Sequence, residues 1–304
     1  MLVGTPAPGV LRGWCPHQPL NLIALTPNLK GPRAFEFHSS SHNRPAIPNK
    51  IINKATIQFI KMKFFLFPLA LLLLTAFTFK EKANIWMIGD STMAWKKPER
   101  APESGWAEGL KNFVDNNVAV HNHAASGRSS RSFIAEGRWK AVLDSIKPGD
   151  YVVIQFGHND EKPDSLLHTD PFTSYKQFLK KFIDETRSKK GIPLICTSIV
   201  RRHFDAQGNL KDTHGDYIKA AREAAIENKT LFIDMEASSR RLVSEMGPET
   251  SKSLFVFCQP GECPRRPKGA ADSTHLNFEG ARQIAALFVR DAKAQKLAIR
   301  KLLK

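Results

Sequence analysis

From residue 84 onward, short runs of apolar and β-branched residues alternate with longer amphipathic stretches. The short runs predict strands buried on both faces, because such strands are apolar along their whole length. They span residues 84–89, 118–122, 151–155, 193–198 and 231–234. The amphipathic stretches predict helices at about 104–116, 130–146, 172–189, 214–228, 236–246 and 278–299.

Strands that alternate with helices predict βαβ units, and therefore an α/β fold in which helices cover both faces of a parallel sheet. The sequence after residue 83 contains neither an internal repeat nor a low-complexity linker. We therefore expect residues 83–304 to form one α/β domain.

A strongly apolar stretch, Phe64 to Phe79, precedes this domain. It follows Lys63 and ends at the polar residues 80–82, which is the layout of a secretory signal peptide. Its 16 residues are short for a membrane span of about 20. We expect residues 62–82 to be a signal peptide and the protein to be secreted or periplasmic. Because no clean A-x-A cleavage site follows, the alternative is an uncleaved N-terminal anchor.

Residues 1–61, upstream of Met62, show no hydrophobic periodicity and contain several prolines and the polar cluster 39–43. Signal peptides belong at the N-terminus. Our hypothesis is therefore that Met62 is the true initiator and that residues 1–61 are a start-site misassignment. The alternative is a disordered N-terminal extension.

The formal net charge of the chain is +16, but residues 83–304 hold 35 Lys and Arg against 27 Asp and Glu, a net charge of +8. A moderately basic exported domain favours an anionic substrate such as a uronate-containing polysaccharide. No nucleic-acid-binding motif is present, and the export signal argues against a nucleic-acid partner. Ordinary solubility explains the charge equally simply.

Two of the four cysteines, Cys258 and Cys263, close a short Pro-Gly loop. In an oxidising compartment we expect a disulfide between them. This loop offers too few ligands for a metal, and we expect neither a metal site nor a cofactor. Cys196 lies within an apolar run and is expected to be a small buried hydrophobe.

Residues able to carry chemistry follow the predicted strands. Parallel sheets of this kind bind ligands at the carboxyl ends of their strands. The four groups are Gly89-Asp90-Ser91-Thr92, Ala125-Ser126-Gly127-Arg128, Gly157-His158-Asn159-Asp160 and Arg201-Arg202-His203.

A serine, a histidine and an aspartate in this set predict a serine hydrolase. A serine hydroxyl is a weak nucleophile that needs an adjacent base, and the base needs a group that orients it. We expect Ser91 to be the nucleophile, His275 the general base, and Asp272 the group that folds back onto His275 in a turn. Taken singly, each residue has a plainer explanation: a helix cap for Ser91, a turn cap for Asp272 and a loop histidine for His275.

Gly127 and Asn159 are the expected oxyanion-hole members, together with the backbone N–H of Ser91. A glycine permits close approach of the backbone, and an asparagine amide donates without a change of charge. Taken singly, either residue could serve only a turn. His158 is a weaker candidate for the base than His275, because no acid is so well placed to orient it.

The blocks Gly89-Asp90-Ser91, Gly127, Gly157-His158-Asn159-Asp160 and Asp272-Ser273-Thr274-His275 occur in the order and spacing of the SGNH, or GDSL-type, hydrolases, which this chain resembles. With threonine at position 92, the chain resembles the rhamnogalacturonan acetylesterases (the carbohydrate esterase family 12 type). Lipolytic members usually have leucine at this position. Further matches are Gly105-Trp106 and residues 122–132, 201–204, 214–217, 222–223, 275–277 and 280–281. The resemblance covers about residues 84–298.

This resemblance implies a three-layer α/β/α fold with a doubly wound, flavodoxin-like sheet of five parallel strands. It implies removal of acetyl groups from the rhamnogalacturonan backbone of pectin, with the catalytic and oxyanion roles as given above. The substrate would be an acetylated polysaccharide or oligosaccharide. We expect a monomer that meets a membrane only through an uncleaved anchor.

Because an acetyl group is small, selectivity is expected to come from sugar contacts around the cleft. Arg128, Arg201 and Arg202 are candidates to contact uronate carboxylates. Trp95 or Trp106 is a candidate to stack on sugar rings, although Trp106 also fits core packing.

Three other functions remain open at the sequence level. One is a lipid esterase or thioesterase of the same superfamily, and another is an acetylesterase for xylan or another glycan. The third is a carbohydrate-binding module with an inactive site, which the complete set of catalytic residues disfavours.

Overall fold

The computed structural model describes residues 84–304 of the chain. The predicted signal peptide or anchor at 62–82 and the predicted extension at 1–61 lie outside the described residues.

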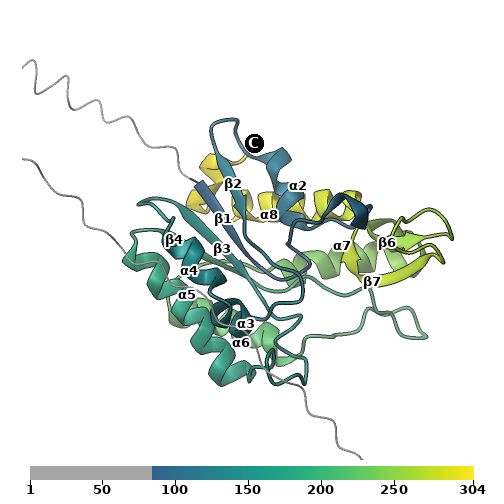
Figure 1. Ribbon diagram of the computed structural model, residues 1–304, viewed down its shortest axis with the longest axis horizontal. Helices are drawn as coiled ribbons and strands as arrows, with labels where there is room; N and C mark the ends of the chain where they lie inside the picture. Colours follow the sequence, from purple (N-terminus) through teal and green to yellow (C-terminus); the bar gives the residue numbers. More distant parts are fainter. Residues whose placement is uncertain (1–83) are drawn as a thin grey trace, which may run out of the picture. The chain divides into compact units, whose positions relative to one another are not determined.

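Five strands form one parallel sheet in the order β2-β1-β3-β4-β5 (Figure 1). Their bounds are β1 Asn84–Gly89, β2 Ala119–Asn122, β3 Tyr151–Gln155, β4 Ile192–Cys196 and β5 Leu231–Ile233. The chain runs from β1 to one edge and then returns to the other side of β1, so the winding direction reverses between β1 and β3. In doubly wound sheets this switch point is where ligands bind. The predicted sheet is confirmed.

Helices cover both faces of the sheet, which gives three layers. Their bounds are α2 Trp106–Leu110, α3 Ser130–Ala135, α4 Arg138–Leu143, α5 Lys176–Ser188, α6 Asp216–Glu227, α7 Met235–Thr250 and α8 Phe278–Ala294. Figure 1 shows α2, α7 and α8 on one side and α3 to α6 on the other. Side chains alternate between the faces of a strand, so Ile85 and Met87 of β1 enter one hydrophobic core while Trp86 and Ile88 enter the other.

Some helix boundaries differ from the predicted ones for local reasons. The helix expected at 130–146 is split into α3 and α4, because Gly137 has a φ of +71°. The side chains and backbone N–H groups of Ser129 and Ser132 form a reciprocal cap at the start of α3. Helix α7 extends beyond its predicted end to Thr250, with a kink at Gly247.

A two-stranded antiparallel sheet lies between α7 and α8, where no element was predicted. It consists of β6 Phe255–Cys258 and β7 Ala270–Leu276. Phe255 pairs with Leu276 and Val256 with Asp272. A shift of one residue along β6 thus corresponds to a shift of four residues along β7. Residues 273–275 therefore bulge out of the pairing. Bulges of this kind redirect side chains beside active sites.

The segment that follows the bulge is held tightly by backbone contacts. Asn277 caps α8 by accepting from the N–H of Gly280 at 2.9 Å, and its amide donates to the carbonyls of Ser253 and Phe255. A Cβ atom on Gly280 would lie 1.9 Å from the carbonyl oxygen of Leu254. The start of α8 therefore has little freedom to move relative to β6.

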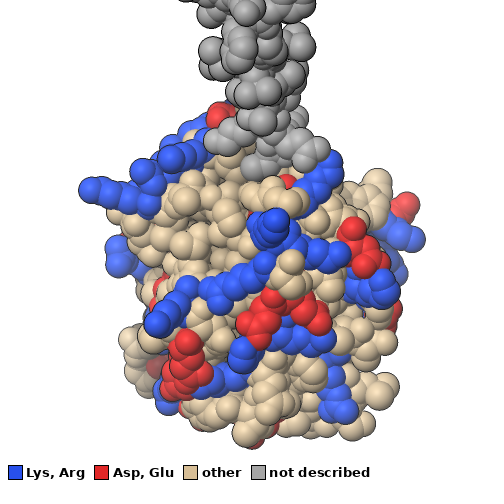
Figure 2. Space-filling model, turned by 90° about the vertical axis from the view of Figure 1, so that its left-hand side faces the viewer, with Lys and Arg blue, Asp and Glu red and all other residues tan. Residues whose placement is uncertain are grey.

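None of the helices within residues 84–304 combines the length and the hydropathy needed to cross a membrane. On the face shown in Figure 2, Lys and Arg side chains are interleaved with Asp and Glu. Among the described residues, ion pairs one helical turn apart include Lys140 with Asp144 and Lys181 with Glu185. Exposed pairs of this type contribute only about 0.3–0.5 kcal/mol each.

Candidate active site

Ser91, His275 and Asp272 lie in hydrogen-bonding sequence at the carboxyl end of β1. The Oγ of Ser91 is 3.0 Å from Nε2 of His275, and Nδ1 of His275 is 2.9 Å from Oδ2 of Asp272. A proton on Nδ1 that is donated to the carboxylate leaves Nε2 free to accept from the serine hydroxyl. This is the arrangement needed for a serine nucleophile with a histidine base.

Asp272 is fixed by four donors. Its Oδ1 accepts from the backbone N–H groups of Thr274 and His275 at 2.9 and 3.0 Å. Its Oδ2 accepts from His275 and from Nη2 of Arg266, the latter at 3.0 Å. Burial on its own would raise the pKa of Asp272, but the hydrogen bonds and charge of His275 hold this pKa well below its ordinary value. The carboxylate is thus ionised and orients the imidazole.

The turn that carries Ser91 is braced by a buried polar chain. Oδ1 of Asp90 accepts from the backbone N–H and the hydroxyl of Thr92 at 2.9 and 2.8 Å. The side chain of Gln155 donates to Oγ1 of Thr92 at 2.8 Å and accepts from Nε1 of Trp106 at 2.8 Å. Thr92 therefore ties the nucleophile turn to β3. Trp106 is 0% exposed, so it packs in the core and does not stack on a sugar.

His158 belongs to the support of this turn. It is buried, and its Nδ1 lies 3.3 Å from Oδ2 of Asp90. Its ring meets that of His214 edge-on, with ring centroids 4.5 Å apart. Burial on its own would raise the pKa of Asp90, but the His158 charge lowers it below the ordinary value. The sequence did not predict this contact between His158 and Asp90.

Ser91, Gly127 and Asn159, the predicted oxyanion donors, follow the adjacent strands β1, β2 and β3. Gly127 has a φ of +78° in a turn where the Arg128 N–H donates to the Ala125 carbonyl, and only glycine adopts this conformation readily. A Cβ at Gly127 would have no neighbour within 4 Å, so the backbone there faces open space. Their catalytic roles stay predictions.

Side-chain bonds hold the loops that carry these donors. Nδ2 of Asn159 donates to the carbonyl of Arg128 at 3.1 Å, which leaves its second hydrogen for another acceptor. Nζ of Lys96 donates to Oγ of Ser126 at 2.9 Å. The loop after β2 is therefore fastened both to β3 and to the nucleophile turn.

All three arginines predicted to contact uronates have partners within the protein, and Arg202 is the most buried of them. Arg202 is buried, with Nε 3.0 Å from Oγ of Ser251 and a second bond to the Pro248 carbonyl. Its guanidinium also lies over the Phe257 ring, 4.9 Å from the centroid. Its backbone N–H donates to the carbonyl of Ser273 at 2.7 Å, inside the β7 bulge. This placement contradicts a sugar contact for Arg202 and gives it a supporting role instead.

Arg201 forms an ion pair with Glu161 and donates to the carbonyls of Thr213 and His158, both at 3.2 Å. Arg128 lies at the surface and pairs with Glu136 at 2.9 Å. Sugar contacts at Arg201 and Arg128 stay predictions.

Trp95 lies in an open groove of about 550 Å³, which Lys96 and Phe278 also line. Trp95 is 56% exposed and Phe278 61% exposed. Exposed rings beside a groove suit stacking on a sugar, and the sugar contact of Trp95 stays a prediction. Phe278 was not predicted, although its position just after the His275 motif was a signal for it.

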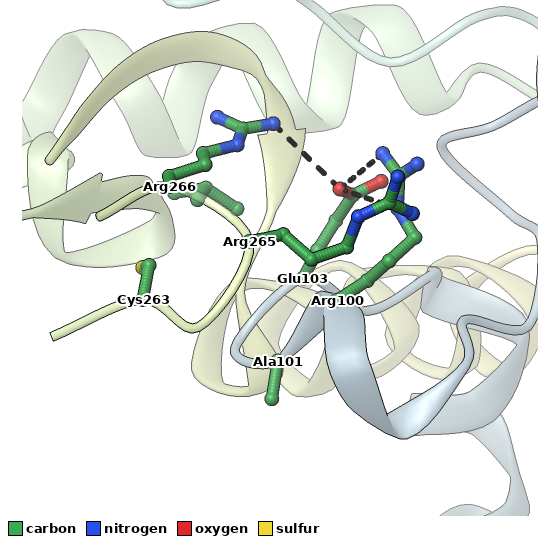
Figure 3. Close-up of a pocket in the computed structure, with 7 residues that line it drawn as sticks. Arg100, Ala101, Glu103, Cys263, Arg265 and Arg266 are labelled. Carbon is green, nitrogen blue, oxygen red and sulfur yellow. Dashed lines mark hydrogen bonds and ion pairs between the residues drawn. The ribbon is translucent and has the colours of Figure 1, made fainter. Parts of the chain in front are cut away.

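The structure joins Cys258 and Cys263 by a disulfide, the pairing expected from the sequence. The loop that this bond closes leads into a second, smaller cavity of about 200 Å³ (Figure 3). Among the residues that line it are Arg100, Glu103, Val256, Cys263, Arg265 and Arg266. Arg266 was not among the predicted site residues, although the cysteine loop lies only a few residues before Asp272.

Comparison with known proteins identifies related sequences. The model of the GDSL-like lipase/acylhydrolase family matches residues 87–283. The chain is 40% identical to the rhamnogalacturonan acetylesterase RhgT of Bacillus subtilis, over 68% of this chain and 88% of that protein. It is 33% identical to the probable rhamnogalacturonan acetylesterase YesY of the same bacterium, over 69% of this chain and 92% of that protein.

Among solved structures, Bacillus subtilis YxiM superposes with a TM-score of 0.61 at 28% identity. The match covers 71% of this chain and 58% of the YxiM chain.

Proposed function

The chain belongs to the GDSL-like lipase/acylhydrolase family, and from this premise we propose that it is a serine esterase that removes O-acetyl groups from rhamnogalacturonan. The observation that carries the proposal is the unbroken sequence of contacts from Ser91 to His275 to Asp272. The relatives named above supply the substrate class, since two are named as certain or probable rhamnogalacturonan acetylesterases.

The first half-reaction transfers the acetyl group to Ser91. The Oγ of Ser91 attacks the ester carbonyl while Nε2 of His275 accepts the hydroxyl proton. Negative charge develops on the carbonyl oxygen, which would face the N–H groups of Ser91 and Gly127 and the amide of Asn159. Asp272 stays ionised and stabilises the imidazolium. The bond from the acetyl carbon to the sugar oxygen then breaks, and this oxygen takes the proton from His275 to become a hydroxyl, so an acetyl-enzyme remains.

The second half-reaction restores the enzyme. His275 accepts a proton from water, whose oxygen attacks the acetyl carbon. The C–O bond to Ser91 breaks, and the serine oxygen recovers the proton from His275. The products are acetate and a deacetylated sugar, and no redox step is needed.

The test of this function is Ser91→Ala. We expect acetate release from acetylated rhamnogalacturonan to fall by roughly 10⁵-fold or more, because the covalent route is removed. Circular dichroism and the urea unfolding midpoint should stay close to the wild-type values. Ser188→Ala, at the exposed end of α5, is the matched control and should leave turnover unchanged. Near-normal turnover by Ser91→Ala would refute the assignment.

Substrate comparison separates the alternatives. Acetate release from acetylated rhamnogalacturonan, homogalacturonan and xylan should be greatest for the first. Among nitrophenyl esters, the acetyl ester should be preferred over long-chain esters. A preference for long acyl chains would favour a lipid esterase or thioesterase, and a preference for xylan would favour another glycan acetylesterase.

We also propose that the protein acts outside the cytoplasm, after export through residues 62–82. The apolar stretch with its flanking charges supports this proposal, as does a disulfide, which persists in oxidising compartments. N-terminal sequencing of the native protein from the periplasm or culture fluid tests both the cleavage and the start at Met62. Recovery of any peptide from residues 1–60 would contradict the start at Met62.

A further inference from the structure

The cavity in Figure 3 adjoins the candidate active site through an ion pair and through Val256, which lines the cavity and pairs with Asp272. Nη2 of Arg266, on its wall, is 3.0 Å from Oδ2 of Asp272. Asp272 is in turn bound to His275, and His275 to Ser91. A ligand in this cavity would therefore lie on the Asp272 side of the candidate active site and not at Ser91 itself.

The walls of the cavity carry more positive than negative charge. Figure 3 shows the carboxylate of Glu103 between the guanidinium groups of Arg100 and Arg266. Glu103 is 3% exposed and lies 2.7 Å from Arg100 and 2.9 Å from Lys96. Its charge is thus already matched inside the protein. Arg265 also lines the cavity and has neither an ion pair nor a side-chain hydrogen bond with any residue in 84–304.

This cavity is built on a fixed frame. The isolated bridge between Glu103 and Asn277, and the bond from the Ser104 N–H to the Leu276 carbonyl at 2.9 Å, hold one wall against the end of β7. The disulfide at Cys263 and the bond from the Arg266 N–H to the Cys263 carbonyl hold the arginine loop. The two walls are therefore anchored to the strand that carries Asp272 and His275.

We infer that this cavity is a subsite for the carboxylate of an acidic sugar residue in the substrate chain, with Arg265 as its ligand. The inference rests on the proposed function. A guanidinium presents paired donors that match the two oxygens of a carboxylate. The volume of about 200 Å³ lies below that of pockets that enclose whole drug-sized ligands, about 300–1,000 Å³. It suits one charged group of a larger chain.

Arg266 is not a ligand in this arrangement, because its guanidinium is held by Asp272. A carboxylate bound at Arg265 would instead fix the position of the sugar chain relative to Ser91. The subsite would raise affinity for acidic substrates without taking part in bond making or breaking.

The test is Arg265→Gln, which keeps a polar side chain but removes the charge and shortens the chain, as does the control below. We expect kcat/KM for acetylated rhamnogalacturonan oligosaccharides to fall by roughly 10-fold or more, mainly through KM, as expected for one lost charge-assisted hydrogen bond. Turnover of 4-nitrophenyl acetate and of neutral acetylated xylo-oligosaccharides should stay unchanged. The matched control is Lys268→Gln, which removes one charge from the same loop outside the cavity lining. It should have little effect.

A second measurement does not depend on turnover. Deacetylated rhamnogalacturonan oligosaccharides should bind to the Ser91→Ala protein, and adding Arg265→Gln should weaken this binding by a similar factor. Weaker binding of these oligosaccharides by the double variant would support the subsite, even if wild-type turnover contradicted the proposed function.

Three results would overturn the subsite. The first is equal loss with Lys268→Gln and Arg265→Gln, which would indicate a general charge effect. The second is unchanged kinetics and binding of the acidic substrate after Arg265→Gln. The third is inhibition of 4-nitrophenyl acetate turnover by free acetate that requires Arg265, which would place the product, rather than a uronate, in the cavity.

Discussion

Two aspartates near the candidate site have pKa values shifted in opposite directions. The pKa of Asp272 is lowered, because His275 and two backbone N–H groups stabilise the charged carboxylate. Burial raises the pKa of Asp160 to about 7, although Ser130 and Thr169 donate hydrogen bonds to it. One carboxylate is thus suited to pair with an imidazolium. The Asp160 carboxyl group is suited to stay protonated below neutral pH and to support the structure.

Asp160→Asn should remove a pH-dependent loss of stability. Between about pH 4 and pH 7 the unfolded chain releases the Asp160 proton while the folded protein keeps it, so wild-type stability from this group falls as pH rises. The fall is about 1.4 kcal/mol per unit of pKa shift, and it ends above pH 7. Urea unfolding from pH 4.5 to 7.5 should therefore favour the variant increasingly at higher pH.

Asp164→Asn, at an exposed loop position, serves as the control for the loss of one carboxylate. A stability difference between Asp160→Asn and the wild type that is constant across this pH range would contradict the raised pKa.

Residue type and spacing were enough to predict that Ser91, His275 and Asp272 would meet. Ser91 and His275 are 184 residues apart in sequence, yet they meet at 3.0 Å as expected. Residue type did not reveal side-chain direction. Arg202 turns into the protein, toward Ser251, whereas Arg265 lines a cavity. Direction after a strand end depends on packing partners that are remote in sequence.

At the scale of elements, the junction between β7 and α8 determines where His275 lies. The carbonyl of Leu254 accepts from the N–H of Asn277 at 3.1 Å, and Gly280 packs directly on that carbonyl. Any side chain on Gly280 would push α8 away from this point. The displacement would be passed to His275, two residues before the cap of α8.

Gly280→Ala should therefore be destabilising, although alanine favours a helix more than glycine does. The new Cβ would lie 1.9 Å from the Leu254 oxygen, and overpacking of this kind typically costs about 1–3 kcal/mol. Turnover of 4-nitrophenyl acetate should fall as well, because the Ser91 to His275 distance changes. Gln283→Ala, one turn later on α8, is the control and should change stability by less than about 0.5 kcal/mol. Wild-type stability and turnover in Gly280→Ala would show that the junction between β7 and α8 accommodates the new Cβ without displacing His275.

The elements that sequence predicted best were those with a strong hydrophobic pattern. All five strands of the main sheet lie within a few residues of their expected positions. The strand β7 was missed because its residues, Ala270 to Leu276, include Asp272, Ser273 and Thr274 and lack regular alternation. Its pairing with β6 depends on distant contacts and on the disulfide, neither of which hydrophobic periodicity reports.

At the scale of the whole molecule, net charge should affect encounter with an acidic polysaccharide. Residues 83–304 carry a net charge of +8, and Figure 2 shows basic and acidic groups interleaved on one face. Long-range attraction between such a protein and a polyanion is screened by salt, with a Debye length of about 8 Å at 0.15 M.

Raising the ionic strength from about 0.02 to 0.5 M should therefore lower kcat/KM for acetylated rhamnogalacturonan, while turnover of 4-nitrophenyl acetate stays constant. Steady-state kinetics with both substrates across this range provide the measurement. Arg265→Gln should reduce the salt dependence only partly, because the rest of the net charge remains. Salt independence with the acidic substrate would argue that charge does not guide binding.

The nucleophile and its base come from opposite ends of the described chain: Ser91 follows β1, and His275 lies in the β7 bulge. The exposed turn at 205–209 lies between them in sequence. A cut there would separate two fragments, neither of which could hydrolyse an ester alone. Pairing of β4 with β5 and packing of α2 against α8 would be the contacts available to rejoin them. Ester cleavage would then signal fragment reassociation, so this fold is a natural starting point for a split-enzyme reporter.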